Sequence, residues 1–260
     1  MTASFLEKID WSRPWLAHVR TMGQAIAMAP DWRAELNRRA AEAGLCNHRR
    51  LPIHFIPQAQ LPPGVAYEAH ISDTGGVPTR DNLHDFFNAL VWLTFPQIKA
   101  RLNGLQAEEL KKSAGSPNRP HRGSLRDAAT IFDENAVLLV SSNSMLVDAL
   151  RRHEWTEVFI RHRSSFIQHC RPYLFGHALM EKLVTPYKAI TGHMWVQSVQ
   201  AIAYSDWSVT AVDNWIASQL DAGLTTADFS PLPVLGVPEW WYGQDEFFYL
   251  DTSVFRSARC

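Results

Sequence analysis

Residues 77–92, VPTRDNLHDFFNALVW, constrain the fold of this chain most strongly. They place His84, Asp85 and Asn88 among large apolar side chains that are suited to burial. A buried polar group costs free energy unless it finds a hydrogen-bond partner. The segment must therefore either pair these three side chains inside the protein or use them to line a cavity.

Two later segments repeat this pattern. Residues 126–135, RDAATIFDEN, and residues 175–183, FGHALMEKL, also embed ionisable side chains in apolar sequence. Three such segments predict one shared polar site, built from parts of the chain that are far apart in sequence.

The length and composition describe an ordinary globular protein. The chain has 260 residues, 46% of them hydrophobic and 20% charged, which fits one domain over residues 1–260. No apolar run approaches the roughly 20 residues that a membrane-spanning helix needs, so we expect no membrane association and a cytoplasmic location. The three cysteines are odd in number and widely separated, which favours reduced thiols.

Apolar periodicity predicts a mostly helical chain. Pro30 and Gly44 bound two N-terminal helices, and Pro96 opens a long amphipathic helix. The helices expected from this pattern cover residues 13–29, 31–43, 82–94, 96–112, 125–132, 144–152, 155–163, 174–184 and 210–220.

Short apolar runs predict a small β component. Residues 53–56 and 65–71 resemble strands separated by prolines, and residues 136–141, AVLLVS, resemble a buried strand. Residues 229–241 contain three prolines and should pack as an ordered loop without regular structure. The fold class expected is therefore α+β, mostly helical, in a single domain with one small β-sheet.

Residues 113–124, SAGSPNRPHRGS, are rich in proline, glycine and small polar residues. This composition predicts a surface loop. Its position between two of the polar segments suggests a lid over the site, with Arg122 available to bind an anion.

His84 and Asn88 are four residues apart, so a helix projects them from one face, together with Asp85. A histidine beside a carboxylate suits general acid/base catalysis near neutral pH. The alternative is a structural network in which these side chains only satisfy one another and the backbone.

His177 and Glu181 have the same spacing, which allows a shared metal ion or a direct hydrogen bond between them. We predict His84, Asp85, His177 and Glu181 as ligands of a divalent metal ion, with Asp127 and Glu134 as further carboxylates. The predicted catalytic residues are His84, Asp85, Asn88, His177 and Glu181.

Arg80 and Arg126 are the predicted substrate-binding residues, because a guanidinium group suits a carboxylate or phosphate group. Arg126 and Asp127 could equally cap a helix or pair at the surface.

A second alignment of the same region is to the His-Asn-His nucleases. His70, Asn82 and Asn88 occur in the order that these enzymes use, with a histidine at the end of a strand and a metal ligand on the following helix. The interval between the two asparagines is shorter than in that motif, so this nuclease is kept as an alternative.

Charge is distributed unevenly along the chain. Residues 189–255 contain eight acidic residues and no lysine or arginine, so the rest of the chain carries a net charge of +7. Acidic and basic surfaces can complement each other within one fold. The alternative is a basic face that binds a partner such as nucleic acid, in a scaffold or binding protein without catalysis.

Four ordered blocks support a family resemblance: residues 77–103, 122–135, 175–187 and 231–241. Over residues 60–256, the chain resembles the proteobacterial family known as domain of unknown function 3025. The resemblance implies a single bacterial cytoplasmic domain with a family core at residues 60–256. The helical N-terminal segment at residues 1–50 is predicted from apolar periodicity and precedes this core. It implies no activity, but its blocks contain every predicted site residue.

Taken together, these patterns predict a metal-dependent or acid/base hydrolase that acts on an anionic substrate, either a small molecule or nucleic acid. His84 and Asp85 would form the base or ligand pair, with His177 and Glu181 as partners from a second helix. Arg80 or Arg126 would hold the anionic group.

Overall fold

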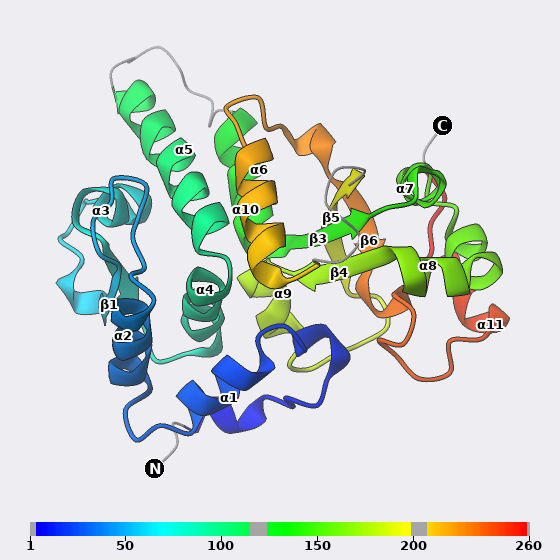
Figure 1. The fold of residues 1–260 in the computed structure, drawn as a ribbon, viewed down its shortest axis with the longest axis horizontal. Helices are drawn as coiled ribbons and strands as arrows, with labels where there is room; N and C mark the ends of the chain where they lie inside the picture. Colours follow the sequence, from blue (N-terminus) through cyan, green and yellow to red (C-terminus); the bar gives the residue numbers. More distant parts are fainter. Residues whose placement is uncertain (1–3, 115–123, 199–206, 259–260) are drawn as a thin grey trace.

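The computed structural model describes residues 4–114, 124–198 and 207–258. The chain is mostly helical in these ranges, with two sheets (Figure 1). The helices longer than one turn are α1 (Arg20–Ala27), α2 (Trp32–Glu42), α3 (Tyr67–Thr74), α4 (Leu83–Thr94), α5 (Pro96–Ala114), α6 (Ser124–Asn135), α7 (Ser144–Arg151), α8 (Arg163–His169), α9 (His177–Lys182) and α10 (Val209–Gln219). The short helix α11 is Glu246–Tyr249.

Two sheets replace the single small sheet that the sequence predicts. The smaller pairs β1 (His54–Pro57) with β2 (Gly76–Thr79) in parallel. The larger has the order β4-β3-β5-β6, and consists of β3 (Ala136–Ser141), β4 (Cys170–Leu174), β5 (Thr191–Ser198) and β6 (Ser230–Pro233). The prediction of one sheet is wrong because β2, β4, β5 and β6 carry no alternating pattern strong enough to mark them as strands.

The strand β3 lies in the middle of the larger sheet, parallel to β5 and antiparallel to β4. All six of its residues are buried, which agrees with the prediction for residues 136–141. β6 is an edge strand that contains Pro231 and Pro233, and an edge tolerates residues without a backbone N–H. The prediction that residues 229–241 lack regular structure is therefore wrong at β6.

The predicted strand at residues 65–71 is wrong, because this region forms the helix α3. Tyr67 and Ile71 lie one helical turn apart, and Ile71 is buried. A short apolar run fits the period of a helix as well as that of a strand. The signal in the sequence that favours a helix here is Gly75. This residue ends α3 with a φ of +75°, a conformation that glycine adopts readily.

Three predicted helices have different bounds in the structure. Residues 13–29 contain a 3₁₀ turn, Pro14–Leu16, before α1 begins. Residues 155–163 contain a π-helical turn, Glu157–Arg161. Residues 174–184 begin in the strand β4, and only His177–Lys182 are helical. The other predicted helices match α2, α4, α5, α6, α7 and α10 to within a few residues.

The helix α5 begins at Pro96, directly after α4. A proline suits this position because the first N–H groups of a helix have no partner within the helix. The next two N–H groups, of Gln97 and Ile98, donate to the Asp213 carboxylate on α10 at 2.9 Å each. This contact fixes the start of α5 relative to α10.

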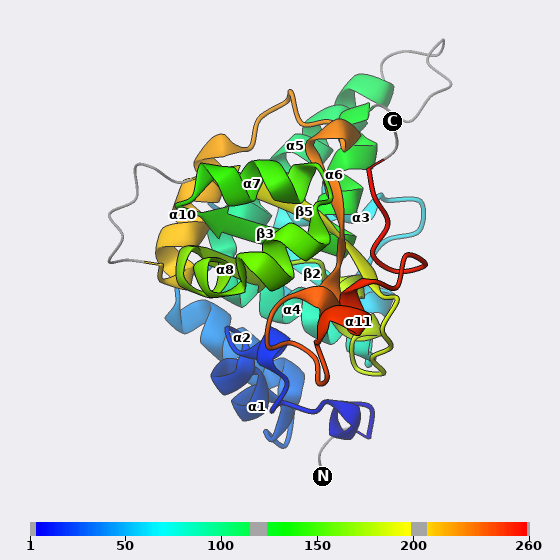
Figure 2. The same ribbon diagram turned by 90° about the vertical axis from the view of Figure 1, so that its right-hand side faces the viewer.

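The N-terminal helices pack against the rest of the chain. In both views α1 and α2 lie together at one end of the molecule (Figures 1 and 2). Trp32 of α2 makes an edge-to-face contact with Phe86 of α4, with 5.6 Å between ring centroids. The helix α4 also packs against α9. Together these two helices position the site described below.

None of the described helices is both long and apolar enough to cross a membrane. Most of the predicted lid, residues 115–123 with Arg122, lies outside the described residues.

Candidate metal centre

The polar residues His84, Asp85 and Asn88 lie in the first two turns of α4. The Asn82 side chain accepts a hydrogen bond from the backbone N–H of Asp85 at 2.8 Å and so caps the helix. Phe86 and Phe87 are fully buried. His84 therefore starts from a helix whose position is fixed by its cap and by its apolar residues.

Asp85 forms an ion pair with Arg80. Its two carboxylate oxygens accept from the guanidinium Nη2 and Nε at 2.9 and 3.0 Å, and one of them also accepts from the backbone N–H of Arg80 at 2.6 Å. The hydrogen bonds that Arg80 donates to Asp85 raise the pKa of Arg80. The structure thus uses Asp85 to orient Arg80. Asp85 lines the same cavity as His84, His177 and Glu134, but it is not one of the residues whose ligand atoms all lie within 4.8 Å of one another.

His84 contacts a carboxylate on the neighbouring helix α9. Its Nδ1 lies 3.1 Å from Oε2 of Glu181. This hydrogen bond leaves Nε2 as the ring nitrogen that faces away from Glu181. The predicted pairing of His177 with Glu181 within one helix is replaced by a pairing of His84 with Glu181 between two helices.

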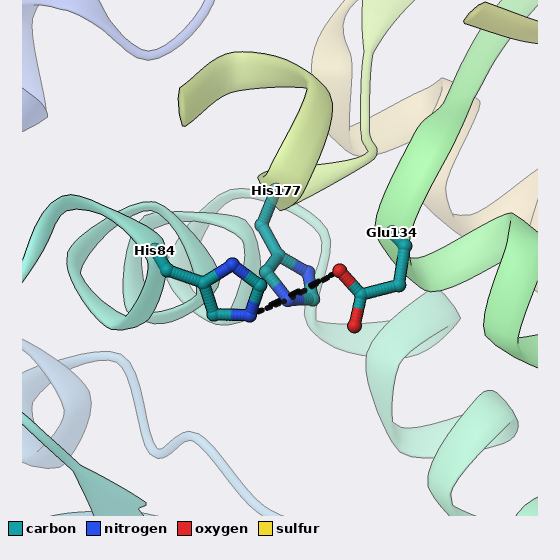
Figure 3. Close-up of side chains that lie close together, drawn as sticks. All are labelled: His84, Glu134 and His177. Atoms are coloured by element: carbon teal, nitrogen blue, oxygen red, sulfur yellow. Dashed lines mark hydrogen bonds and ion pairs between the residues drawn. The ribbon is translucent and has the colours of Figure 1, made fainter. Parts of the chain in front are cut away.

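His84, His177 and Glu134 converge from three elements, α4, α9 and α6 (Figure 3). The two Nε2 atoms lie 3.1 Å apart. Oε2 of Glu134 lies 3.4 Å from Nε2 of His177 and 3.9 Å from Nε2 of His84. The ligand atoms of a tetrahedral zinc site lie about 3.3 Å apart, given Zn–N distances of about 2.0 Å. These three residues could therefore hold a metal ion.

The protonation state of His177 suits a metal ligand. Burial is the main cause that lowers its pKa to about 4, so the imidazole is neutral near pH 7 and one nitrogen keeps a free lone pair. Its Nδ1 lies 4.0 Å from Oδ2 of Asp133. Burial, and then the neighbouring charge of Asp133, raise the pKa of Glu134.

Behind His177, Lys99 is buried between two acceptors. Its ammonium group donates to Oδ1 of Asp133 at 2.6 Å and to Oδ1 of Asn88 at 2.8 Å. Although burial raises the pKa of Asp133, the charge of Lys99 and its hydrogen bond to Asp133 outweigh this effect, and the pKa is lowered. Asn88, Lys99 and Asp133 thus form one internal hydrogen-bond network.

The sequence interpretation missed Lys99 because a single lysine in a basic helix resembles a surface residue. A signal was nevertheless present. Lys99, Asn103 and Gln106 follow the i, i+4, i+7 spacing, which places them in one stripe along α5, and all three are buried.

A cavity of about 400 Å³ lies beside the three converging residues. His84, Glu134 and His177 line it together with both predicted substrate-binding arginines, Arg80 and Arg126. Asp127 and Glu181, two predicted metal ligands, are not among its lining residues. In the part of the chain that the structure describes, the Arg126 guanidinium group forms no hydrogen bond or ion pair.

The geometry does not match the nuclease alignment. His70 lies within the helix α3 and not at the end of a strand, and β1 and β2 run parallel. Asn82 caps α4, and Asn88 accepts from Lys99. The strand-end histidine that this motif needs is therefore absent at His70.

Comparison with known proteins identifies a family but no activity. Among curated proteins and solved structures, none matches this chain. Residues 53–259 match the sequence profile of the family described as Protein of unknown function (DUF3025), which confirms the resemblance that the four sequence blocks predict. Since the match covers most of the chain, the protein belongs to the DUF3025 family.

Proposed function

We propose that this protein is a metal-dependent hydrolase that acts on a substrate with an anionic group. The observation that carries the proposal is the convergence of His84, Glu134 and His177 on one side of a cavity, with all three ligand atoms within 4.8 Å of one another.

The ligand set differs in part from the one expected from the sequence. Glu134 takes the place of Asp85, because Asp85 is bound to Arg80. Glu181 supports His84 through a hydrogen bond at its second ring nitrogen. Among the described residues Nδ1 of His177 has no hydrogen-bond partner, and Asp133 lies 4.0 Å from it. A carboxylate at the second nitrogen of a metal-binding histidine orients the ring and raises its basicity.

Two imidazoles and one carboxylate are a common ligand set for catalytic zinc, which keeps a further position open. A divalent metal ion bound here would act as a Lewis acid and activate water near neutral pH. The protein itself supplies the neutral His177, the oriented His84 and the cavity that receives the substrate.

Arg126 and Arg80 favour an anionic substrate. The Arg126 guanidinium group lines the cavity and has no partner within the described residues, so it can bind a carboxylate or phosphate group. Arg80 lines the same cavity while Asp85 holds it in place.

Metal binding is the first test. Protein stripped with a chelator is titrated with Zn²⁺ against a chromophoric competitor. The wild type should bind one equivalent. His84→Ala, His177→Ala and Glu134→Gln should each weaken binding by at least about a hundredfold, because each removes a ligand.

His54→Ala is the matched control, since His54 is exposed on β1, and it should bind Zn²⁺ as the wild type does. Thermal melts without metal establish that each variant is folded. If the wild type binds no Zn²⁺, or if the three ligand variants bind it as well as the wild type, the proposal fails.

Hydrolysis is tested with nitrophenyl phosphate, phosphodiester and carboxylate ester substrates, with and without Zn²⁺. We expect the zinc-loaded wild type to hydrolyse at least one of these three substrate classes. Glu134→Gln should lose that activity. Arg126→Gln should raise KM more than it lowers kcat, because Arg126 binds the part of the substrate that does not react.

A further inference from the structure

A chain of hydrogen bonds runs from Asp133, next to the candidate metal centre, to Tyr67 on α3. It begins at Asp133, which lies beside His177, and continues through Lys99 to Asn88. The Asn88 amide then reaches the hydroxyl of Tyr67 at 2.9 Å. Tyr67 lines the same cavity as His84 and His177.

The direction of these hydrogen bonds is fixed by Lys99. An ammonium group has three donors and no acceptor, so the atom of Asn88 that it contacts must be the carbonyl oxygen. The Asn88 NH₂ group therefore points the other way and donates to the oxygen of Tyr67. As a result, the proton of the Tyr67 hydroxyl cannot be used in this contact.

In the described ranges, the Tyr67 hydroxyl accepts from Asn88 and donates to no residue. Tyr67 is half-buried at the cavity wall. Burial is the main cause that raises the pKa of Tyr67 well above its ordinary value, so the group keeps its proton. Tyr67 thus presents a hydroxyl proton that none of the described residues accepts.

We infer that the Tyr67 hydroxyl donates a hydrogen bond to an anionic oxygen of the substrate, as a phosphoryl or carboxylate group offers. The inference deepens the proposed function and depends on it for the position of the substrate beside the metal centre. Arg126 lines the same cavity without an ion-pair partner among the described residues, and it supplies the positive charge that such a group needs.

The test measures binding of inorganic phosphate and of acetate to the protein by isothermal titration, with and without Zn²⁺. Tyr67→Phe removes only the hydroxyl oxygen and its proton. It should weaken binding of at least one of the two anions by about tenfold or more, the cost of losing one hydrogen bond to a charged group. The anion that is weakened more identifies the substrate class.

Two further variants separate the hydroxyl from the network. Tyr187→Phe is the matched control, because Tyr187 is 54% exposed, and it should leave anion binding unchanged. Asn88→Leu keeps the Tyr67 hydroxyl but frees its orientation, so it should weaken binding less than Tyr67→Phe does. A larger loss in Asn88→Leu would assign the effect to a disturbed network and overturn the inference.

Zn²⁺ affinity provides the remaining readout. Tyr67→Phe should bind Zn²⁺ within about twofold of the wild type, because Tyr67 is not a ligand in the proposed site. Unchanged anion affinity in Tyr67→Phe, or no anion binding by the wild type in either form, overturns the inference. Anion binding that depends on Tyr67 in a protein that binds no Zn²⁺ would instead overturn the metal proposal alone.

Discussion

His84 and His177 differ at their second ring nitrogens: His84 has a hydrogen-bonded carboxylate there, and His177 has none among the described residues. His84 is hydrogen-bonded to Glu181, whose side chain is 41% exposed, whereas His177 faces the buried Asp133 at 4.0 Å. Glu181 can thus be changed with little effect on the core. A substitution of Glu181 therefore tests the hydrogen bond that orients His84 without removing a proposed metal ligand.

Glu181→Gln should weaken Zn²⁺ binding by about 10- to 100-fold, the usual cost of losing an outer partner of a metal-binding histidine. The thermal stability of the metal-free protein should change little, because Glu181 is at the surface. Competition titration and a melting curve measure the two effects. Glu154→Gln is the control, because Glu154 forms an exposed ion pair and is not among the residues that line the cavity. Equal Zn²⁺ affinities in the two variants would contradict the role given to Glu181.

Single residues also show how far the sequence could predict the site. The ionisable side chains in apolar segments led to His84, His177, Glu134 and Arg126, which all line one cavity. Their division into ligands and supports could not be predicted, because it depends on how α4, α6 and α9 pack. Asp85 illustrates this. It binds Arg80, which is only five residues away, but nothing in the sequence distinguishes an aspartate in such an ion pair from an aspartate that binds a metal ion.

The helix α9 brings His177 to the site, and Gly176 immediately before it allows the close approach. A Cβ atom at Gly176 would lie 2.5 Å from the Cα and N atoms of Asn135 and 2.6 Å from the N atom of Ala136. These are backbone atoms at the junction of α6 and β3, next to Glu134. The glycine therefore sets the distance between two of the proposed ligands.

Gly176→Ala should displace α9 from this junction, destabilise the protein by about 1–3 kcal/mol and weaken Zn²⁺ binding at the same time. Urea denaturation and Zn²⁺ titration measure these effects. At Gly44 a Cβ atom would meet nothing within 4 Å, so Gly44→Ala should cost only about 1 kcal/mol for its positive φ and leave Zn²⁺ affinity unchanged. A Gly176→Ala protein with unaltered Zn²⁺ affinity would show that α9 can shift without moving His177 from the site.

Elements with strong local signals were predicted well, and elements that depend on pairing were not. Asn82 and Pro96 mark the starts of α4 and α5 in the sequence. In contrast, β4 and β5 become strands because they pair with β3 on either side, and their own residues show no clear alternation. A strand of this kind is defined by its neighbours, which a local pattern does not contain.

The N-terminal segment, most of which precedes the family match at residues 53–259, is joined to the rest of the molecule by specific contacts. His18 is one of them. Its Nε2 lies 2.8 Å from the carbonyl oxygen of Leu174, at the end of β4, and its ring packs against Phe95 and Tyr173. We expect this contact to make the attachment of the segment depend on pH.

Burial lowers the pKa of His18 to about 4, although the hydrogen bond to Leu174 opposes this shift. The unfolded chain takes up a proton near the ordinary histidine pKa of 6.5, whereas folded His18 does not. The contribution of His18 to stability is therefore complete above about pH 6.5 and is lost as the pH falls toward 4.

Urea denaturation of the metal-free protein between pH 4 and 7 tests this contribution. The free energy of unfolding should fall less steeply with decreasing pH in His18→Gln than in the wild type. His177, whose pKa is lowered in the same way, contributes equally to both proteins and cancels in the comparison. Identical slopes would mean that His18 is not held neutral in the folded state.

The most direct measurement is an anomalous difference map, at the zinc absorption edge, from a crystal of the protein grown with Zn²⁺. The account predicts one strong peak within about 2.0–2.2 Å of Nε2 of His84, Nε2 of His177 and a carboxylate oxygen of Glu134. A peak bound by other residues, or no peak in this cavity at full Zn²⁺ loading, would contradict it.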